Sequence, residues 1–197
     1  DWAQRNGYVT KNVAESGKKK SNELARNKRD NFTANAYLQF NLAENLTFKT
    51  NLAYDKYLFD AYNYASNEVG YASSVAGRVT QDRDITTSTN VINTLNYKKT
   101  IGKHNFSADV IQEAYNYEID ALGAQGEGFL PGVYVLDGKT TPSSVSGSTT
   151  AERISSYLGR LSYNFDEKYF IEGSYRKDGS SRFNSDVRWG DFYSVGG

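Results

Sequence analysis

Residues 32–54 read FTANAYLQFNLAENLTFKTNLAY, and in this stretch apolar and polar side chains alternate. On both sides of Ala43-Glu44-Asn45 the apolar set occupies the even-numbered positions, and we call such a set of alternate positions the apolar parity of a run. Its members here are Phe32, Ala34, Ala36, Leu38, Phe40, Leu46, Phe48, Thr50, Leu52 and Tyr54. Successive side chains of a β-strand point to opposite faces of the sheet. The alternation therefore predicts two antiparallel strands joined by a short turn, with one apolar and one polar face.

The same alternation recurs in two further pairs of runs along the chain. On one parity these runs carry Ile85, Thr87, Thr89, Val91, Asn93, Leu95 and Tyr97, then Phe106, Ala108, Val110, Gln112 and Ala114, then Tyr157, Gly159, Leu161, Tyr163 and Phe165, and then Tyr169, Ile171, Gly173 and Tyr175. Another strand is expected to begin near Phe192. The sequence thus predicts an all-β fold, an antiparallel up-and-down meander of about seven strands.

The positions of the ionised side chains indicate which face of the strands contacts water and which contacts hydrocarbon. Seven of them lie within the runs, all on the parity opposite the Phe/Leu/Tyr set: Lys49, Asp55, Asp109, Glu113, Arg160, Glu172 and Arg176. Lys56 and Glu118 share the apolar parity, but each lies past the end of its run. A Lys or Arg that faces lipid at the bilayer midplane costs about 2–4 kcal/mol. The segregation therefore predicts part of a transmembrane β-barrel, with hydrocarbon on one face and water on the other.

The connections between the runs alternate in length. Short turns are expected near 42–45, 99–103 and 166–168, and long loops near 1–28, 60–82, 119–152 and 178–188. Outer-membrane barrels have short periplasmic turns and long extracellular loops. We therefore expect the short turns on the periplasmic side and the long loops outside the cell, with the chain in the outer membrane and in contact with its lipid.

Composition agrees with this interpretation. The chain has 23 Lys plus Arg and 23 Asp plus Glu, so its charge does not indicate nucleic-acid binding. The mean hydropathy of −0.68 is compatible with a barrel, because only one face of each strand needs to be apolar. No segment approaches the roughly 20 apolar residues of a membrane-spanning helix. The chain opens without Met and ends on 195–197 in mid-pattern, so we expect both ends to be cut and 1–197 to be part of a barrel.

No motif for catalysis, cofactor binding or metal binding is expected. The one histidine, His104, follows Lys103 with no acid or nucleophile in a recognisable pairing, and a solvated turn residue is the favoured interpretation. Residues 123–128 read GAQGEG, which lacks the strand-to-helix setting and the Lys-Ser/Thr of a phosphate loop. The sequence therefore predicts a protein that is not an enzyme.

The C-terminal quarter carries a more specific signal. Residues 157–163 read YLGRLSY, 176–183 read RKDGSSRF, 188–190 read RWG and 194–196 read SVG. From 153 to 197 the chain resembles the barrel of SusC/RagA-type TonB-linked outer-membrane proteins of Bacteroidetes. Two departures are Asn184-Ser185-Asp186, where a Gly often follows the Phe, and Tyr193 at a common Pro position.

This resemblance implies a 22-stranded TonB-dependent transporter barrel with a plugged lumen. It also implies import of glycan or peptide nutrients together with a SusD-like lipoprotein, powered through TonB. The motif residues are expected to serve structure, with Asp178-Gly179 forming a turn and Arg182 bonded to carboxylates or backbone. They are Arg160, Arg176, Asp178, Gly179, Ser180, Ser181, Arg182, Phe183, Arg188, Trp189 and Gly190.

Aromatic residues in the expected long loops are candidates for contact with substrate or with the partner protein. They are Tyr62, Tyr64, Tyr71, Phe129 and Tyr134. Exposed aromatic rings bury much surface at low entropic cost, which suits binding. Packing within the loops is the alternative, and it is favoured for any single residue of the set.

Two other kinds of protein remain as alternatives. A soluble or surface carbohydrate-binding β-sandwich also alternates, but its strands average about six residues and its core favours bulky aliphatic residues. A small autonomous barrel would need an even number of strands and a closing strand that ends in an aromatic residue, which this sequence lacks.

Overall fold

The computed structural model describes residues 9–10 and 24–197, which form β-strands linked by turns and three short 3-10 helices. The strands are β1 (Val9–Thr10), β2 (Leu24–Ala43), β3 (Leu46–Ala65), β4 (Arg78–Ile101), β5 (His104–Phe129), β6 (Lys139–Phe165), β7 (Tyr169–Ser180) and β8 (Trp189–Gly196). The 3-10 helices are η1 (Ser73–Val75), η2 (Leu136–Gly138) and η3 (Ser185–Val187). None of the described helices is long and apolar enough to cross a membrane.

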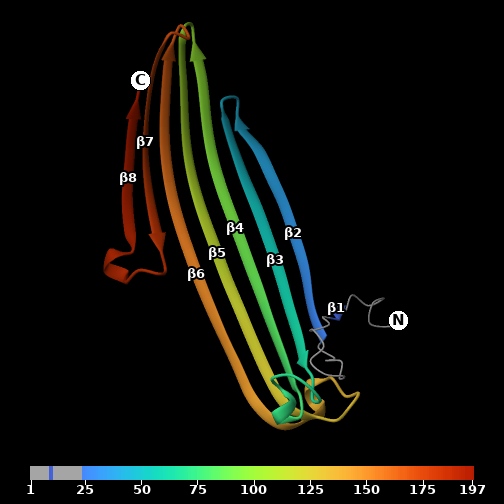
Figure 1. Ribbon diagram of the computed structural model, residues 1–197. Helices are drawn as coiled ribbons and strands as arrows, with labels where there is room; N and C mark the ends of the chain where they lie inside the picture. The colour runs from blue at the N-terminus through green and yellow to red at the C-terminus, as the bar shows by residue number, and fades with distance from the viewer. Residues whose placement is uncertain (1–8, 11–23) are drawn as a thin grey trace. The chain divides into compact units, whose positions relative to one another are not determined.

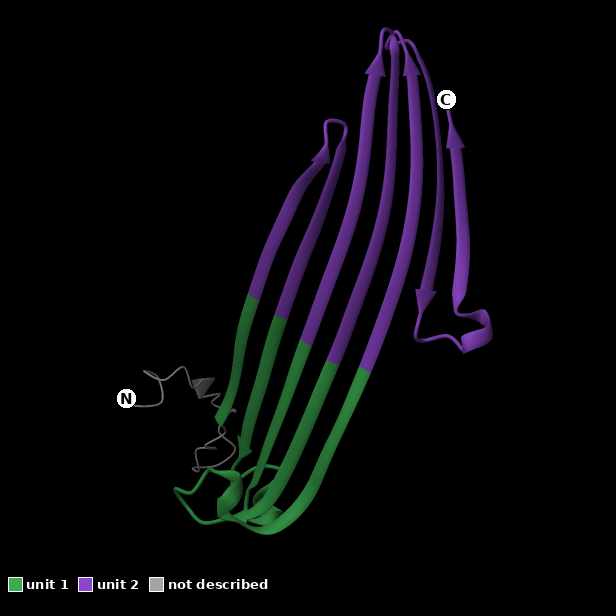
Figure 2. Ribbon diagram, turned by 180° about the vertical axis from the view of Figure 1, so that it is seen from behind, with its two compact units in different colours: residues 1–32, 56–86, 119–150 green, residues 33–55, 87–118, 151–197 purple. Residues whose placement is uncertain are grey.

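Each strand is hydrogen-bonded to its neighbours in chain order, from β1 to β8 (Figure 1). The predicted all-β meander is confirmed, with seven long strands and the two-residue β1. Among the described residues the sheet is open. Its strands form two compact units. The first contains the described residues up to 32 together with 56–86 and 119–150, and the second contains residues 33–55, 87–118 and 151–197 (Figure 2).

The second unit contains most of the alternating runs, and its register separates their two faces. In the β6–β7 ladder Leu161 lies opposite Gly173 and Tyr163 opposite Ile171, so the apolar parity of one strand meets that of the next. We call the face with the Phe/Leu/Tyr rows the apolar face and the other the polar face. On the apolar face Leu161 is 68% exposed and Val110 is 61% exposed. Within this unit no second layer of described residues covers the apolar rows, whereas a β-sandwich would bury them.

The first unit contains the only cluster of buried apolar side chains found among the described residues. Its buried members are Tyr62, Tyr64, Val79 and Phe129, and Leu24, Tyr134 and Leu136 pack against it. The connections 66–77 and 130–138 begin and end beside this cluster. The fold thus has a conventional core where the loops gather, and an uncovered sheet face where the alternating runs lie.

The structure corrects the expected loops. In place of loops at 60–82 and 119–152, β3 continues to Ala65, β4 begins at Arg78, β5 continues to Phe129 and β6 begins at Lys139. Side chains bond across these extensions, as in the pairs Arg78–Glu127 and Thr80–Gln125. Strand pairing satisfies backbone groups whether or not one face is apolar, so the ladders persist after the apolar pattern ends. Most of the loop expected at 1–28 lies outside the described residues, and the side of the membrane on which each connection lies stays a prediction.

Candidate functional site

Arg176 is the centre of a polar network on the polar face of the second unit. Its Nε lies 2.8 Å from Asp178 Oδ1, and its Nη2 donates to Ser156 Oγ at 3.3 Å. Nη2 also lies 3.8 Å from Glu113 Oε2, and the other oxygen of Glu113 accepts a hydrogen bond from Asn90 at 2.9 Å. Partly exposed ion pairs contribute at most about 1 kcal/mol each. The network therefore mainly holds donors and acceptors in place on a surface that water reaches.

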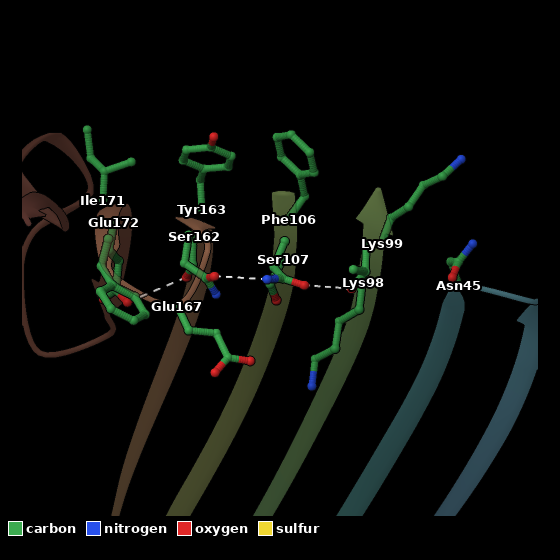
Figure 3. Close-up of a pocket in the computed structure, with 14 residues that line it drawn as sticks. Asn45, Lys98, Lys99, Phe106, Ser107, Ser162, Tyr163, Glu167, Ile171 and Glu172 are labelled. Atoms are coloured by element: carbon green, nitrogen blue, oxygen red, sulfur yellow. Dashed lines mark hydrogen bonds between the residues drawn. The ribbon is translucent and has the colours of Figure 1, made fainter. Parts of the chain in front are cut away.

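The polar face continues to the turn end of the second unit. There Thr100 donates to Asn105 at 2.7 Å and Asn105 donates to Asn164 at 2.9 Å. A cavity of about 600 Å³ lies at this end. Figure 3 shows that Phe106 and Tyr163 extend to one side of the strands and Glu172 to the other. Arg160 pairs with Glu172, so this motif arginine also lies on the polar face. These groups can exchange hydrogen bonds with polar solutes.

The segment that follows Arg176 does not form the turn expected at Asp178-Gly179. Both residues lie in β7, with Asp178 opposite Ser156 and Gly179 opposite Ser155. The prediction was wrong because Asp-Gly specifies a turn only where no neighbouring strand pairs with it, and here both β6 and β8 do. The connection to β8 is 181–188.

This connection is attached to β6 by the motif residues. Ser181 N donates to Arg153 O at 2.9 Å, and Arg153 N donates to Ser181 Oγ at 2.8 Å. Ser180 N donates to Arg188 O at 3.2 Å. Arg182 pairs with Glu152 at 2.8 Å, which confirms the expected bond to a carboxylate. Phe183, by contrast, is 58% exposed, and nothing in the described structure explains its place in the motif.

Gly179 and Trp189 pack closely against each other within the motif. A Cβ built on Gly179 would meet Trp189 ring carbons at 2.8–2.9 Å, so the indole ring lies directly over the glycine. Tyr157 lies 6.2 Å from the same ring, and the ammonium group of Lys177 lies 5.8 Å above it. These residues occupy positions of the apolar face. Gly190, which lies opposite Asp178, is on the polar face. Sequence reasoning missed this contact, which depends on the β7–β8 register.

Four of the five candidate contact residues belong to the aromatic cluster of the first unit. Tyr64 and Phe129 are each 3% exposed and Tyr62 is 8% exposed. The ring of Tyr134 packs against that of Tyr64, with their centroids 4.5 Å apart. Tyr62 Oη also donates to the backbone oxygen of Tyr134. Burial raises the pKa of Tyr64 above its usual value, against an opposing hydrogen bond from Asn67 N. The packing interpretation accounts for these four residues.

Tyr71 differs from the other four because its ring is 69% exposed. The guanidinium of Arg78 lies 5.7 Å from the ring centroid, and Arg78 is itself paired with Glu127 at 2.7 Å. This arrangement restrains one face of the ring and leaves the rest accessible. Contact with a substrate stays a prediction for all five residues.

Sequence reasoning also missed Tyr115 and Tyr117. Their rings lie 6.4 Å apart on β5, at the same parity as Glu113 and therefore on the polar face. The signal was available, because the period-two pattern that places Glu113 on this face places the two tyrosines there as well. They add a partly exposed aromatic surface to the polar face.

His104 lies in an aromatic row at the turn end of the apolar face. Its Nδ1 is 2.8 Å from Tyr163 Oη, and its ring centroid is 5.0 Å from that of Phe165. The residue is exposed, as expected, but it belongs to this row and not to an isolated turn. Over the part of the chain that the structure describes, no three His, Cys, Asp or Glu side chains gather as metal ligands do.

The sequence of the chain is similar to those of several TonB-dependent receptors. The chain is 27% identical over 177 residues to TonB-dependent receptor P3 of Formosa agariphila, covering 85% of this chain but 17% of the receptor. A stretch of 46 residues is 46% identical to TonB-dependent receptor SusC of Bacteroides thetaiotaomicron, which is 23% of this chain and 5% of SusC. No family model matches the chain.

Solved structures agree with the sequence comparison. The structure of the RagAB peptide transporter superposes with a TM-score of 0.80 at 26% identity, covering 89% of this chain and 20% of that one. The chain thus spans less than a fifth of the length of receptor P3. The resemblance to SusC/RagA-type TonB-linked proteins is confirmed, and so is the assignment of the meander to a barrel of that type.

Proposed function

We propose that this chain is a segment of an outer-membrane transporter of the SusC/RagA type that imports glycan or peptide nutrients. The observation that carries the proposal is the separation of side chains on the open sheet. Arg160, Glu172 and Arg176 lie on the polar face, while the uncovered rows of Phe, Leu and Tyr lie on the other. A sheet with these two faces fits between hydrocarbon and a water-filled lumen.

The dimensions of the apolar face support this placement. On β6 the apolar run extends from Tyr157 to Phe165, which corresponds to roughly 27 Å at about 3.4 Å per residue. Barrel strands are tilted by about 35–45°, so this run covers roughly 19–22 Å of an apolar band that is about 25 Å tall and has aromatic girdles at both edges. Tyr157 and Trp189 stand at one edge, and His104, Phe165 and Tyr169 at the other.

The substrate and the partners are inferred from the relatives. One similar structure is a peptide transporter and one similar sequence is SusC, so peptides and oligosaccharides are both candidate substrates, with a SusD-like lipoprotein and TonB as partners. The test is uptake of labelled oligosaccharides and peptides by cells that carry or lack the full-length gene. We expect loss of uptake of one class, with the same loss when TonB is inactivated. Unchanged uptake of both classes would overturn the transport proposal, and release of the protein from cells without detergent would favour the carbohydrate-binding β-sandwich.

Tyr71 is the proposed substrate-contact residue with the most accessible ring. We expect Tyr71→Ala in the full-length protein to lower uptake about two- to tenfold, the range of one lost aromatic contact. Stability should not change, because the ring is exposed. The matched control is Tyr193→Ala, which removes an 85% exposed tyrosine from β8. Equal uptake by the two variants would remove Tyr71 from the site.

A further inference from the structure

A groove lies on the apolar face of the second unit, near the turn that joins β4 to β5. Its volume is about 790 Å³, and its walls include Tyr97, Phe106, Leu161, Tyr163, Ile171 and Val195. Two small residues, Ala108 and Gly173, lie among these large ones. Large side chains around small ones on a sheet leave a channel that an extended hydrocarbon chain can occupy.

Gly173 keeps the middle of this groove open. It lies directly opposite Leu161 on β6 and Val195 on β8. A Cβ built on Gly173 would find no neighbour closer than the Ser194 backbone oxygen at 3.9 Å. The space above Gly173 is therefore not filled by the described residues, and a larger side chain would extend into it.

Lys99 lines the groove where it approaches the turn. The side chain is exposed, and none of the ion pairs formed by the described residues includes it. Nearby, Lys103 and Lys168 both pair with Asp166, at 3.1 and 3.3 Å, so these two ammonium groups already have a carboxylate partner. Among the described residues, Lys99 differs from them in lining the groove without such a partner. Figure 3 shows Lys99 on the same side of the strands as Phe106 and Tyr163, and Lys98 on the opposite side.

We propose that this groove binds an anionic glycerophospholipid, with one acyl chain along the groove and the headgroup phosphate at Lys99. Hydrocarbon suits the apolar walls, and the ammonium group supplies the charge complementarity that selects an anionic headgroup. Tyr163 and His104 lie on the same face near this end, where amphipathic rings meet headgroups. The inference rests on placing the apolar face against lipid and is independent of which solute is transported.

The test uses the full-length transporter, purified in detergent, stripped of lipid and exposed to equal amounts of phosphatidylglycerol and phosphatidylethanolamine. Bound lipid is counted by native mass spectrometry. Lys99→Gln has a matched control in Lys98→Gln, on the opposite face. The matched control for Gly173→Leu is Gly159→Leu, because Gly159 also faces open space on the apolar face but does not line the groove.

We expect the unaltered protein to retain more phosphatidylglycerol than phosphatidylethanolamine. Lys99→Gln should reduce that preference about fivefold, as loss of one lysine near a lipid phosphate implies. Gly173→Leu should reduce retention of both lipids, while both controls behave like the unaltered protein. Cross-linking with a phospholipid that carries a photoreactive acyl chain should label peptides containing Leu161 or Ile171 in the unaltered protein, whatever the folding of the variants.

Three outcomes would overturn the proposal. The first is the same lipid preference in Lys99→Gln and Lys98→Gln, and the second is equal retention in Gly173→Leu and Gly159→Leu. The third is cross-linking that avoids the groove peptides, which is also the result expected if a second copy of the protein covers this face.

Discussion

Leu161→Arg in the full-length protein is expected to destabilise the assembled barrel by about 2–4 kcal/mol, the cost of an arginine that faces lipid near the midplane. Leu161 lies in the interior of the β6 apolar run, and its side chain is 68% exposed on the apolar face. The measurement is urea-induced unfolding in lipid vesicles, with the folded fraction read from heat-modifiable migration in gels. Loss of folded protein at urea concentrations that leave the unaltered barrel intact is the expected result.

The matched control is Ser162→Arg, the same substitution one residue along β6. Ser162 lies on the polar face, with its hydroxyl 3.5 Å from Glu172 Oε2. An arginine there meets water and a carboxylate, so we expect a change within about 0.5 kcal/mol, as for an ordinary surface substitution. If the two variants unfold at the same urea concentration, the two faces do not meet different solvents, and the barrel assignment fails.

Gly179→Leu is expected to destabilise the pairing of β7 with β8 by about 1–3 kcal/mol, the usual range for overpacking. The first carbon of the new side chain would already be 2.8–2.9 Å from the Trp189 ring, which must therefore move. Moving the ring also separates it from Tyr157 and Lys177. The same unfolding assay in the full-length protein measures the effect.

Two further variants connect this loss to the indole ring. Gly173→Leu is the control on the same strand and face, since a Cβ there has 3.9 Å of space, and it should leave stability nearly unchanged. In a double-mutant cycle, Gly179→Leu should cost less when Trp189 is already alanine. An undiminished cost in the Trp189→Ala background would show that the glycine is required for another reason.

The separation of the faces could be predicted from residues such as Lys49, Glu113 and Arg160. Their parity relative to the Phe/Leu/Tyr rows needs only the alternation of a strand, which is a local property. Which of the aromatic candidates are buried could not be predicted in the same way. Tyr64 and Phe129 are buried by contacts with residues far away in the sequence; the hydrogen bond from Asn67 to Phe129 O, for example, joins residues 62 positions apart. Nothing in the local sequence distinguishes these two residues from the exposed Tyr71.

The sequence by itself determined that this chain forms antiparallel strands with an apolar and a polar face, because the direction of a side chain in a strand follows from its position alone. Only the tertiary structure decided how far the strands continue beyond the apolar runs, which candidate rings are buried and that Gly179 lies beneath Trp189. These features depend on the register between strands. Register arises from contacts between residues distant in the chain, and the alternation of a single strand does not contain it.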